Sequence, residues 1–442
     1  MDNGALRNKV YKGLEAISNY HYSECQGSVN DKHFPVNPVL ETLTYFLNKN
    51  CLLTGDPGWG KTTSAKIVTS VLSGVPYDLL DSTEIRGHPH LYEEKLTGRF
   101  DFHELTTKGE KVLWRPSFSM PSLIVDEANW IPYEGQAVIL QGIETGRWLY
   151  MDHSFFEGKK PTYFAINKRP EEGNGLWHAL EDRVDISLPF EPLSTTDMLF
   201  LQQAKERVER ELYDNKITEE AMRVIKNDRK KLTEYFDNLS RKEKAFSAQE
   251  KEMIKKQISE IPFDDDATLF LQSFTAELNF SQKYGKKRSE DGISEDTHDK
   301  NYIGVFFKNS LSPRAWMAVR DYSSALAWLL DDKKVTRNHL EFIIPYAIHH
   351  KLKPTNDLRN ELAGKTREVP ESLFIAGHAM RKAADNYEAS IQPTKNLINK
   401  LQLGKLSEKE IKELKEEAYD HPFVKDLIRK VKEPKPFYNE GK

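Results

Sequence analysis

The chain has 442 residues, of which 38% are hydrophobic and 30% are charged, and its formal net charge is −4 at pH 7. This length exceeds one ordinary core and predicts two or three domains, while the composition excludes a disordered chain. The slightly negative charge argues against a dedicated nucleic-acid binder, although a local basic groove stays open as an alternative.

The cysteine content and the apolar runs of the chain indicate in which cellular compartment the protein is expected. The two cysteines, Cys25 and Cys51, indicate neither a disulfide framework nor a zinc site. Residues 1–20 contain no long apolar run typical of a signal peptide, and no uninterrupted apolar stretch approaches the length of a membrane span. We therefore expect a cytoplasmic protein without membrane insertion.

The first part of the chain predicts the opening of an α/β unit. Residues 1–35 indicate a helix and a loop, and apolar spacing over 38–49 predicts a second helix. A short apolar strand at 51–54 leads through a glycine-rich turn into a helix at 62–72, which is a strand–loop–helix unit. Residues 83–118 show no hydrophobic periodicity of a helix or a strand, which predicts irregular structure.

The next segments predict the rest of a sheet. An apolar strand within 122–129 ends in two acids, and a helix at about 133–145 follows it. Alternating aromatic and polar residues predict a hairpin over 146–160, and apolar runs predict strands at 161–167 and 184–190. Alternating strands and helices indicate a parallel sheet covered on both faces.

The second half predicts helices. Residues 203–260 are dominated by charged residues and predict long, exposed helices forming a hairpin. Residues 281–301 are polar and predict a mobile loop. Helical spacing returns at 313–332 and 336–352, and the tail from about residue 370 is helical and charged.

The segment GDPGWGKT at 55–62 matches the phosphate-binding pattern G-x-x-x-x-G-K-[ST], or Walker A motif. Glycines permit backbone conformations in which successive N–H groups surround phosphate oxygens, and the following helix points its positive end at them. Lys61 would contact the β- and γ-phosphates, and the Thr62 hydroxyl would bind Mg²⁺. The predicted nucleotide-binding residues here are Gly55, Asp56, Pro57, Gly58, Trp59, Gly60, Lys61, Thr62 and Thr63.

The segment LIVDE at 123–127 supplies the second half of the site, a Walker B motif. A buried strand would deliver Asp126 to the edge of the sheet, where it would hold Mg²⁺ directly or through water. Glu127 would orient and polarise the attacking water. An apolar run that ends in two acids is a weak signal alone, but it becomes strong when it follows a P-loop at this spacing.

The order of these pieces resembles that of the AAA+ ATPases and, within them, the MoxR group. The resemblance covers most of residues 38–195 and 310–352. Beyond the P-loop it is carried by DEANWIPYEGQAVILQGIETG (126–146), FAINKRPEEGNGLWHALEDRVDISLPF (164–190), LSPRAWMAVRDYSSALAWL (311–329) and VTRNHLEFIIPYAIHHKL (335–352).

The resemblance assigns roles to three further polar residues. Asn167 would act as the first sensor, positioning the water or touching the γ-phosphate. Arg183 resembles the arginine finger, which would reach the γ-phosphate bound in the neighbouring subunit, and Arg314 resembles the sensor-2 arginine of the lid, contacting nucleotide in cis or in trans. The alternatives are a polar strand end for Asn167 and ordinary surface roles for the two arginines.

Two inserts, at 86–118 and 146–160, resemble segments that line the central pore of related ATPases and touch the substrate. The aromatic residues of the second insert either face the substrate or pack the hairpin itself, and both alternatives stay open. They are Trp148, Tyr150, Phe155 and Phe156.

The sequence departs from the group in three places. Asn129 and Trp130 follow the acidic motif where the group commonly carries Asn-Arg, and Trp59 is bulky for the interior of a phosphate loop. The charged segment 203–300 exceeds the usual connection to the lid, which predicts a protruding helical element for partner docking or a solvated hairpin of no specific role. The scattered histidines do not predict a metal site.

These observations predict an α/β fold with four segments. They are an AAA+ P-loop αβα core with a parallel sheet over 1–195, a charged helical insertion and lid start over 196–310, an all-α lid over 311–355, and a helical C-terminal extension over 356–442. The expected reaction is Mg²⁺-dependent hydrolysis of ATP to ADP and phosphate.

An arginine finger requires a neighbour, so we expect a homo-oligomeric ring, in the first instance a hexamer, that remodels protein substrates in the manner of a chaperone. The resemblance also implies a partner with a von Willebrand A domain and a role in assembling protein complexes. A nucleic-acid motor or loader is the second hypothesis, and a nucleotide-gated scaffold the third. ATP is preferred over GTP by resemblance alone.

Overall fold

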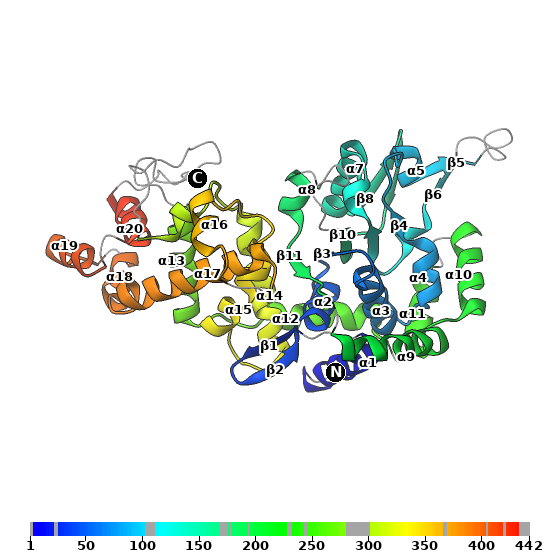
Figure 1. Ribbon diagram of the computed structural model, residues 1–442, viewed down its shortest axis with the longest axis horizontal. Coiled ribbons are helices and arrows are strands. Elements are labelled where there is room, and N and C mark those ends of the chain that lie inside the picture. Colours follow the sequence, from blue (N-terminus) through cyan, green and yellow to red (C-terminus); the bar gives the residue numbers. More distant parts are fainter. Residues whose placement is uncertain are drawn as a thin grey trace, which may run out of the picture. The chain divides into compact units, whose positions relative to one another are not determined.

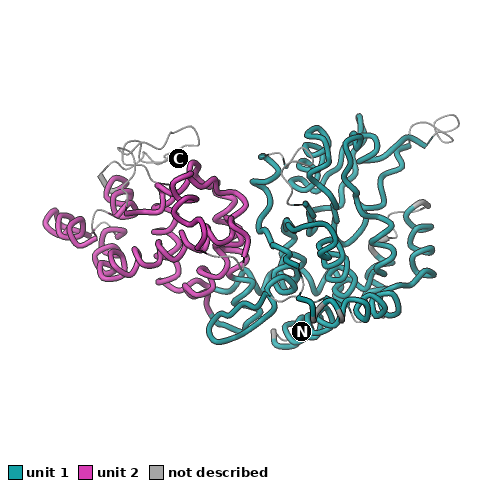
Figure 2. Tube along the Cα trace, viewed as in Figure 1, with its two compact units in different colours: residues 1–261, 324–333 teal, residues 262–323, 334–442 magenta. Residues whose placement is uncertain are grey.

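The computed structural model divides the chain into two compact units (Figure 2). Unit 1 comprises Met1–Ile261 and Ser324–Lys333, and unit 2 comprises Pro262–Ser323 and Lys334–Lys442. The loop predicted at 281–301 lies, apart from Asn301, outside the described residues. The structure describes residues 3–21, 25–101, 111–167, 176, 178–192, 194–227, 232–242, 245–279, 301–365, 369–403, 405–418 and 421–432.

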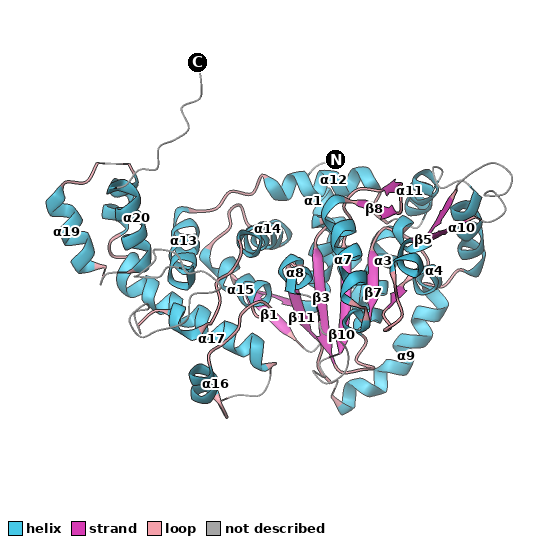
Figure 3. Ribbon diagram, turned by 90° about the horizontal axis from the view of Figure 1, so that it is seen from above, coloured by secondary structure: helices cyan, strands magenta, loops and turns pink. Residues whose placement is uncertain are grey.

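Unit 1 is built on a five-stranded parallel sheet with the strand order β11-β3-β10-β7-β4 (Figures 1 and 3). Along the chain these strands occur in the order β3, β4, β7, β10 and β11. In the sheet, β10 lies between β3 and β7. The strands are β3 (Asn50–Gly55), β4 (Ile85–Arg86), β7 (Leu123–Asp126), β10 (Thr162–Asn167) and β11 (Ile186–Pro189).

Four helices cover the sheet: α2 (Val36–Leu47), α3 (Lys61–Ser73), α7 (Tyr133–Thr145) and α8 (His178–Arg183). Helices α2 and α3 share one face, where the Tyr163 hydroxyl of β10 donates to the backbone carbonyl of Glu41 at 2.8 Å. On the other face Phe164 packs in one cluster with Ile139 of α7 and Leu180 of α8. Because neighbouring strand residues point to opposite faces, Tyr163 and Phe164 join the two helical layers to one strand.

Short elements surround this core where the sequence indicated a loop or irregular structure. A hairpin of β1 (Gln26–Val29) and β2 (Lys32–Pro35) occupies the predicted N-terminal loop, and the edge strand β4 lies within the segment predicted as irregular. Strands this short carry no measurable period, so periodicity could not reveal them. The helix predicted near the N-terminus is α1 (Asn3–Ser18). The other elements of this part of the chain are α4 (Tyr77–Thr83), α5 (Glu93–Thr97), β5 (Gly98–Phe100), β6 (Val112–Trp114), η1 (Pro116–Ser119) and η2 (Ala128–Trp130).

The predicted hairpin of the second insert is present as β8 (Arg147–Tyr150) and β9 (His153–Phe156). Trp148 is 3% exposed and stacks on Phe118 with ring centroids 3.9 Å apart, and Tyr150 is also buried. Phe155 stacks on Trp114 at 5.5 Å, whereas Phe156 is 66% exposed. The first three aromatics therefore pack the insert, and Phe156 alone of the four is presented on the surface.

The charged segment after the sheet forms four helices of unit 1 and not a protruding hairpin. Ala221 and Ile225 of α10 and Leu239 of α11 bury against Leu79 and Leu80 of α4. When a strongly charged helix has only a narrow apolar stripe, its overall composition does not reveal that the stripe is packed. The four helices are α9 (Thr195–Glu211), α10 (Asn215–Asn227), α11 (Leu232–Lys242) and α12 (Ala248–Ser259).

Unit 2 is helical, as predicted for the lid and the tail, which share one core. Glu277 of α13 accepts from His421 before α20 at 2.9 Å and from Asn386 of α17 at 2.9 Å. None of the described helices is long and apolar enough to cross a membrane. The elements are α13 (Asp265–Asn279), η4 (Ile303–Phe306), α14 (Pro313–Leu329), α15 (Arg337–Ile348), α16 (Asn356–Leu362), α17 (Glu371–Asn386), η5 (Tyr387–Ile391), α18 (Lys395–Gln402), α19 (Glu408–Glu417) and α20 (Pro422–Lys432). The last part of α14, from Ser324 onward, is assigned to unit 1.

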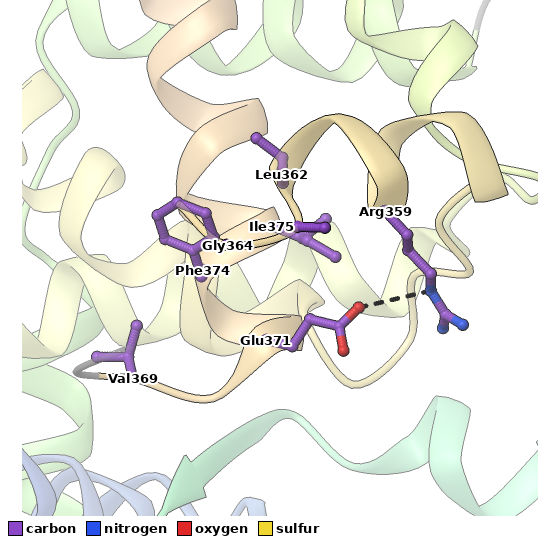
Figure 4. A pocket seen from close by; sticks show the side chains of 8 residues that line it. Arg359, Leu362, Gly364, Val369, Glu371, Phe374 and Ile375 are labelled. Carbon is purple, nitrogen blue, oxygen red and sulfur yellow. Dashed lines mark ion pairs between the residues drawn. The ribbon is translucent and has the colours of Figure 1, made fainter. Parts of the chain in front are cut away.

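A pocket of about 310 Å³ lies between α16 and α17 of unit 2 (Figure 4). Its lining is mostly apolar, with Leu362, Phe374 and Ile375 among the side chains, and Arg359 and Glu371 form an ion pair of 3.7 Å beside it. Arg359 and Glu371 are the two charged residues of the lining, and they are paired with each other.

A carboxyl group is buried between α2 and α3. Glu41 has no exposed surface, and its Oε1 accepts a hydrogen bond of 2.7 Å from the Ser64 hydroxyl in the first turn of α3. Burial raises the pKa of Glu41 from 4.5 to about 8, and the bond from Ser64 only partly opposes this rise. The side chain is therefore a neutral acid at pH 7.

Replacing Glu41 by Gln should change how stability depends on pH. The raised pKa means that the stabilising effect of Glu41 is fully present below about pH 4.5 and is lost as the pH rises through about 8. Glu41→Gln keeps an acceptor for Ser64 and cannot ionise, so it should gain stability relative to the wild type across this window. Urea unfolding followed by circular dichroism at a series of pH values measures the effect.

The exposed carboxylate variant Glu134→Gln is the matched control and should parallel the wild type. If Glu41→Gln also parallels the wild type between pH 5 and pH 8, the buried carboxyl does not titrate as described.

Candidate nucleotide-binding site

The P-loop lies between β3 and α3, as the sequence predicts. Gly55 ends the strand, and a Cβ at this position would meet the Phe190 carbonyl oxygen at 2.5 Å, so only glycine fits there. Gly60 precedes α3 with φ 79°, a left-handed conformation that residues with side chains rarely adopt. The two glycines thus shape a loop that ends at the positive end of a helix.

Lys61 is the first residue of α3, and its ammonium group is held by three oxygen atoms. Nζ donates to the carbonyl of Gly55 at 2.8 Å, to the carbonyl of Asp56 at 2.7 Å and to Oδ1 of Asn167 at 3.1 Å. Asn167 lies opposite Gly55 in the register of β10 with β3. The register therefore brings the predicted sensor to the lysine of the P-loop.

Thr62 and Asp126 form the second contact across the site. The Thr62 hydroxyl donates to Oδ1 of Asp126 at 2.7 Å, and the same oxygen accepts from the backbone N–H of Glu127 at 3.0 Å. A hydroxyl and a carboxylate are oxygen ligands of the kind that Mg²⁺ takes from proteins, with phosphates and waters completing its shell. Among the described residues, no group of three or more His, Cys, Asp or Glu side chains is arranged to hold a metal ion by itself.

Glu127 follows the strand in an unusual backbone conformation. Its φ is 49°, in the left-handed region that costs a residue with a side chain about 1–3 kcal/mol. Its side chain is exposed at the edge of the sheet. Strain of this kind concentrates at functional sites, which agrees with the predicted role of Glu127.

The two predicted arginines belong to α8 and α14. Arg183 ends α8, where Nη1 donates to the Ala179 carbonyl at 2.8 Å and Nε forms an ion pair of 2.6 Å with Glu144 of α7. Arg314 is exposed in the first turn of α14 and belongs to unit 2. Their contacts with nucleotide stay predictions.

A pocket of about 440 Å³ adjoins the P-loop, and no sequence pattern predicted it. Gly58, Trp59 and Gly60 form one side, and Tyr77 and Tyr213 stack at 5.4 Å with an interplanar angle of 14° on another. Its remaining lining residues come from the segment after α1, from α3 and from α9. They are Tyr20, His21, Thr63, Ile67, Met198, Leu201, Ala204, Lys205, Val208 and Glu209.

His21 is the notable polar group of this pocket. Its ring packs edge-on to Phe190 at 5.8 Å, and its Nδ1 is buried without a hydrogen-bond partner among the described residues. Burial lowers the pKa of His21 from 6.5 to about 4, so the imidazole is neutral at pH 7. Aromatic rings and a neutral imidazole suit a planar, uncharged heterocycle better than another phosphate.

No family model matches the chain, and no curated protein matches it at a significant level. A solved structure of a candidate ATPase from Cytophaga hutchinsonii matches with a TM-score of 0.55 and 15% identity, covering 86% of this chain and 96% of that one. A full-length MCM homolog from Methanopyrus kandleri matches with a TM-score of 0.43 and 10% identity, covering 79% of this chain and 62% of that one, which is too low to carry an argument.

At such identities the comparison concerns the fold. The chain has an α/β, AAA+-like fold, in which a five-stranded parallel sheet precedes a mostly helical C-terminal region. This confirms the fold class that the sequence predicted.

Aromatic contacts in the pocket should contribute to nucleotide affinity. Stacking of a base on an aromatic side chain is worth about 1–3 kcal/mol when tested by substitution with alanine. Trp59→Ala and Tyr213→Ala should each weaken ADP binding about tenfold or more, as measured by isothermal titration calorimetry on the full chain.

Tyr133→Ala removes an exposed aromatic side chain that does not line the pocket and serves as the control. Unchanged ADP affinity in both pocket variants would show that the base binds elsewhere.

Proposed function

We propose that the chain is an AAA+ ATPase similar to the MoxR group, which hydrolyses ATP to ADP and phosphate with Mg²⁺. The observation that carries the proposal is the convergence of Lys61, Thr62, Asp126 and Asn167 at the carboxyl ends of three neighbouring strands, with contacts of 2.7 Å and 3.1 Å between them. Ligands of open α/β sheets bind outside these strand ends.

Each residue has a role that its position suits. Lys61 would exchange its carbonyl partners for the β- and γ-phosphate oxygens and balance their charge. Thr62 and Asp126 would hold Mg²⁺, which would supply further neutralisation of the phosphates. Glu127 would accept a proton from the attacking water, and the Asn167 amide would orient that water or contact the γ-phosphate.

The base would occupy the pocket beside the P-loop. Trp59 lies within the phosphate loop and lines the pocket, so one loop would contact both the phosphates and the base. Trp59, the bulky residue that distinguishes this loop, would therefore contact the base. A neutral His21 and the aromatic lining suit a planar, uncharged base. We propose adenine as that base from the resemblance to the AAA+ ATPases.

We propose further that the chain works as a homo-oligomeric ring, in the first instance a hexamer. Arg183 is bound to Glu144 within its own chain, and a phosphate of the neighbouring subunit would replace that carboxylate. Arg314 would contact nucleotide as the lid moves. The exposed aromatic side chains of the inserts, Tyr92 and Phe156, would meet a protein substrate that the ring remodels.

Removing the proposed base should trap ATP. Glu127→Gln keeps the size of the side chain and cannot accept the proton, so turnover should fall about a hundredfold or more while ATP binding persists. Phosphate release and light scattering in the presence of ATP measure turnover and ring formation together. Equal turnover in the variant and the wild type would remove Glu127 from the mechanism, and stimulation of the wild type by DNA would favour a nucleic-acid motor instead.

The same trapped variant tests the proposed partner. Glu127→Gln held with ATP should retain a protein with a von Willebrand A domain in a pull-down. If no such protein is recovered, that part of the proposal fails.

An arginine finger acts between subunits, which a mixing experiment can detect. Arg183→Ala should bind ATP normally and lose turnover by about a thousandfold. Mixed with Lys61→Ala, it should regain part of the activity, because some interfaces then combine an intact P-loop with an intact Arg183. Phosphate release from the mixture, compared with the sum of the separate variants, measures this.

Glu144→Ala is the control, since it frees Arg183 without removing it and should keep turnover. A mixture no more active than its components would place the function of Arg183 within its own chain.

A further inference from the structure

An arginine lies beside the acidic motif on the edge strand of the sheet. Arg86 ends β4 and is the register partner of Asp126 in β7. Register partners in parallel strands project to the same face, and neighbouring strands are about 4.8 Å apart. Since Asp126 contacts Thr62 of α3, Arg86 also projects toward the α3 face, within reach of the Asp126 carboxylate.

The guanidinium is held by a chain of charges that begins on α3. Lys66 forms ion pairs of 2.6 Å with both Asp81 and Glu84, and Glu84 in turn pairs with Nε of Arg86. The Glu84 side chain is 3% exposed, whereas that of Arg86 is 66% exposed. The charge and hydrogen bond of Glu84, followed by the charges of Asp81 and Asp126, raise the pKa of Arg86 above its usual range.

The backbone after Arg86 lies close to the backbone of the acidic motif. The Gly87 N–H donates to the Asp126 carbonyl at 2.8 Å, and a Cβ on Gly87 would meet the Glu127 carbonyl oxygen at 2.1 Å. Glycine therefore permits a close approach of the two chains. The backbone of Arg86 therefore lies beside that of Asp126, and its guanidinium pairs with Glu84 and Asp81.

The arginine also supplies a charge that the acidic motif itself omits. Trp130 stands where the resemblance led us to expect a basic residue after the acidic pair. Arg86 brings a positive charge to the same edge from the adjacent strand.

We propose that Arg86 is a built-in counter-ion of Asp126 and Glu127, which stabilises the pair in the absence of metal and weakens the binding of the divalent cation. The inference rests on the proposed Mg²⁺ site at Thr62 and Asp126. A positive charge on the strand next to Asp126 would repel a divalent cation held there, and the surface position of Arg86 leaves that repulsion sensitive to salt. Arg86 is thus a positioning residue that adjusts how readily the site accepts and releases metal.

The test measures metal affinity directly, with Mn²⁺ as the probe. Free Mn²⁺ is followed by electron paramagnetic resonance during titration of the full chain with ADP present, at low and at high salt. Arg86→Gln should bind Mn²⁺ about threefold to tenfold more tightly than the wild type at low salt, and the difference should shrink at high salt. Arg86→Lys keeps the charge and should stay within about twofold of the wild type.

Two controls separate the possible outcomes. Arg147→Gln removes one exposed positive charge away from the acidic motif and should leave Mn²⁺ affinity unchanged, while Asp126→Asn should abolish binding. If Arg86→Gln binds Mn²⁺ as the wild type does or more weakly, or if it binds ADP more weakly in EDTA, the counter-ion role is overturned and the metal site stands. If the wild type binds no Mn²⁺, the proposed function loses its metal site as well.

Discussion

The pairing of β10 with both β3 and β7 is the constraint on which the rest of the site depends. Asn167 lies opposite Gly55, and the same strand pairs in parallel with β7 on its other side. One strand therefore aligns the ends of its two neighbours, and the residues that follow them reach a common edge. The contacts of Lys61 with Asn167 and of Thr62 with Asp126 are consequences of this alignment, since α3 begins directly beyond β3.

Helix α3 also contacts residues near the edge strand β4 of the sheet. Thr62 and Lys66 are four residues apart, so they share one face of the helix. The first binds Asp126 of β7, and the second binds Glu84 just before β4. A single helix thus ties the P-loop, the acidic strand and the edge strand together. For this reason Arg86, at a strand end far from the P-loop in sequence, belongs to the same electrostatic system.

The sequence predicted the parts of this arrangement that depend on local pattern and could not predict those that depend on distant packing. The short apolar run at 51–54 and the P-loop pattern revealed β3 and its helix because both signals lie within one short segment. The two-residue strand β4 carries no period, and the pocket beside the P-loop joins Tyr20, Trp59 and Tyr213, which only the folded chain brings together. Helices α10 and α11 were predicted as helices, but their packing against α4 was missed because their high charge masked narrow apolar stripes.

The two faces of the first turns of α3 differ in charge, and this difference serves the proposed chemistry. The face with Thr62 meets carboxylates, whose negative charge a divalent cation would offset. Ser64 faces the opposite way, toward Glu41, where an ionised carboxylate close to the helix start would repel the phosphates that the loop is shaped to bind. Burial keeps that carboxyl neutral at pH 7. The positive end of α3 is therefore left available to the nucleotide, while Ser64 still has a polar partner inside the core.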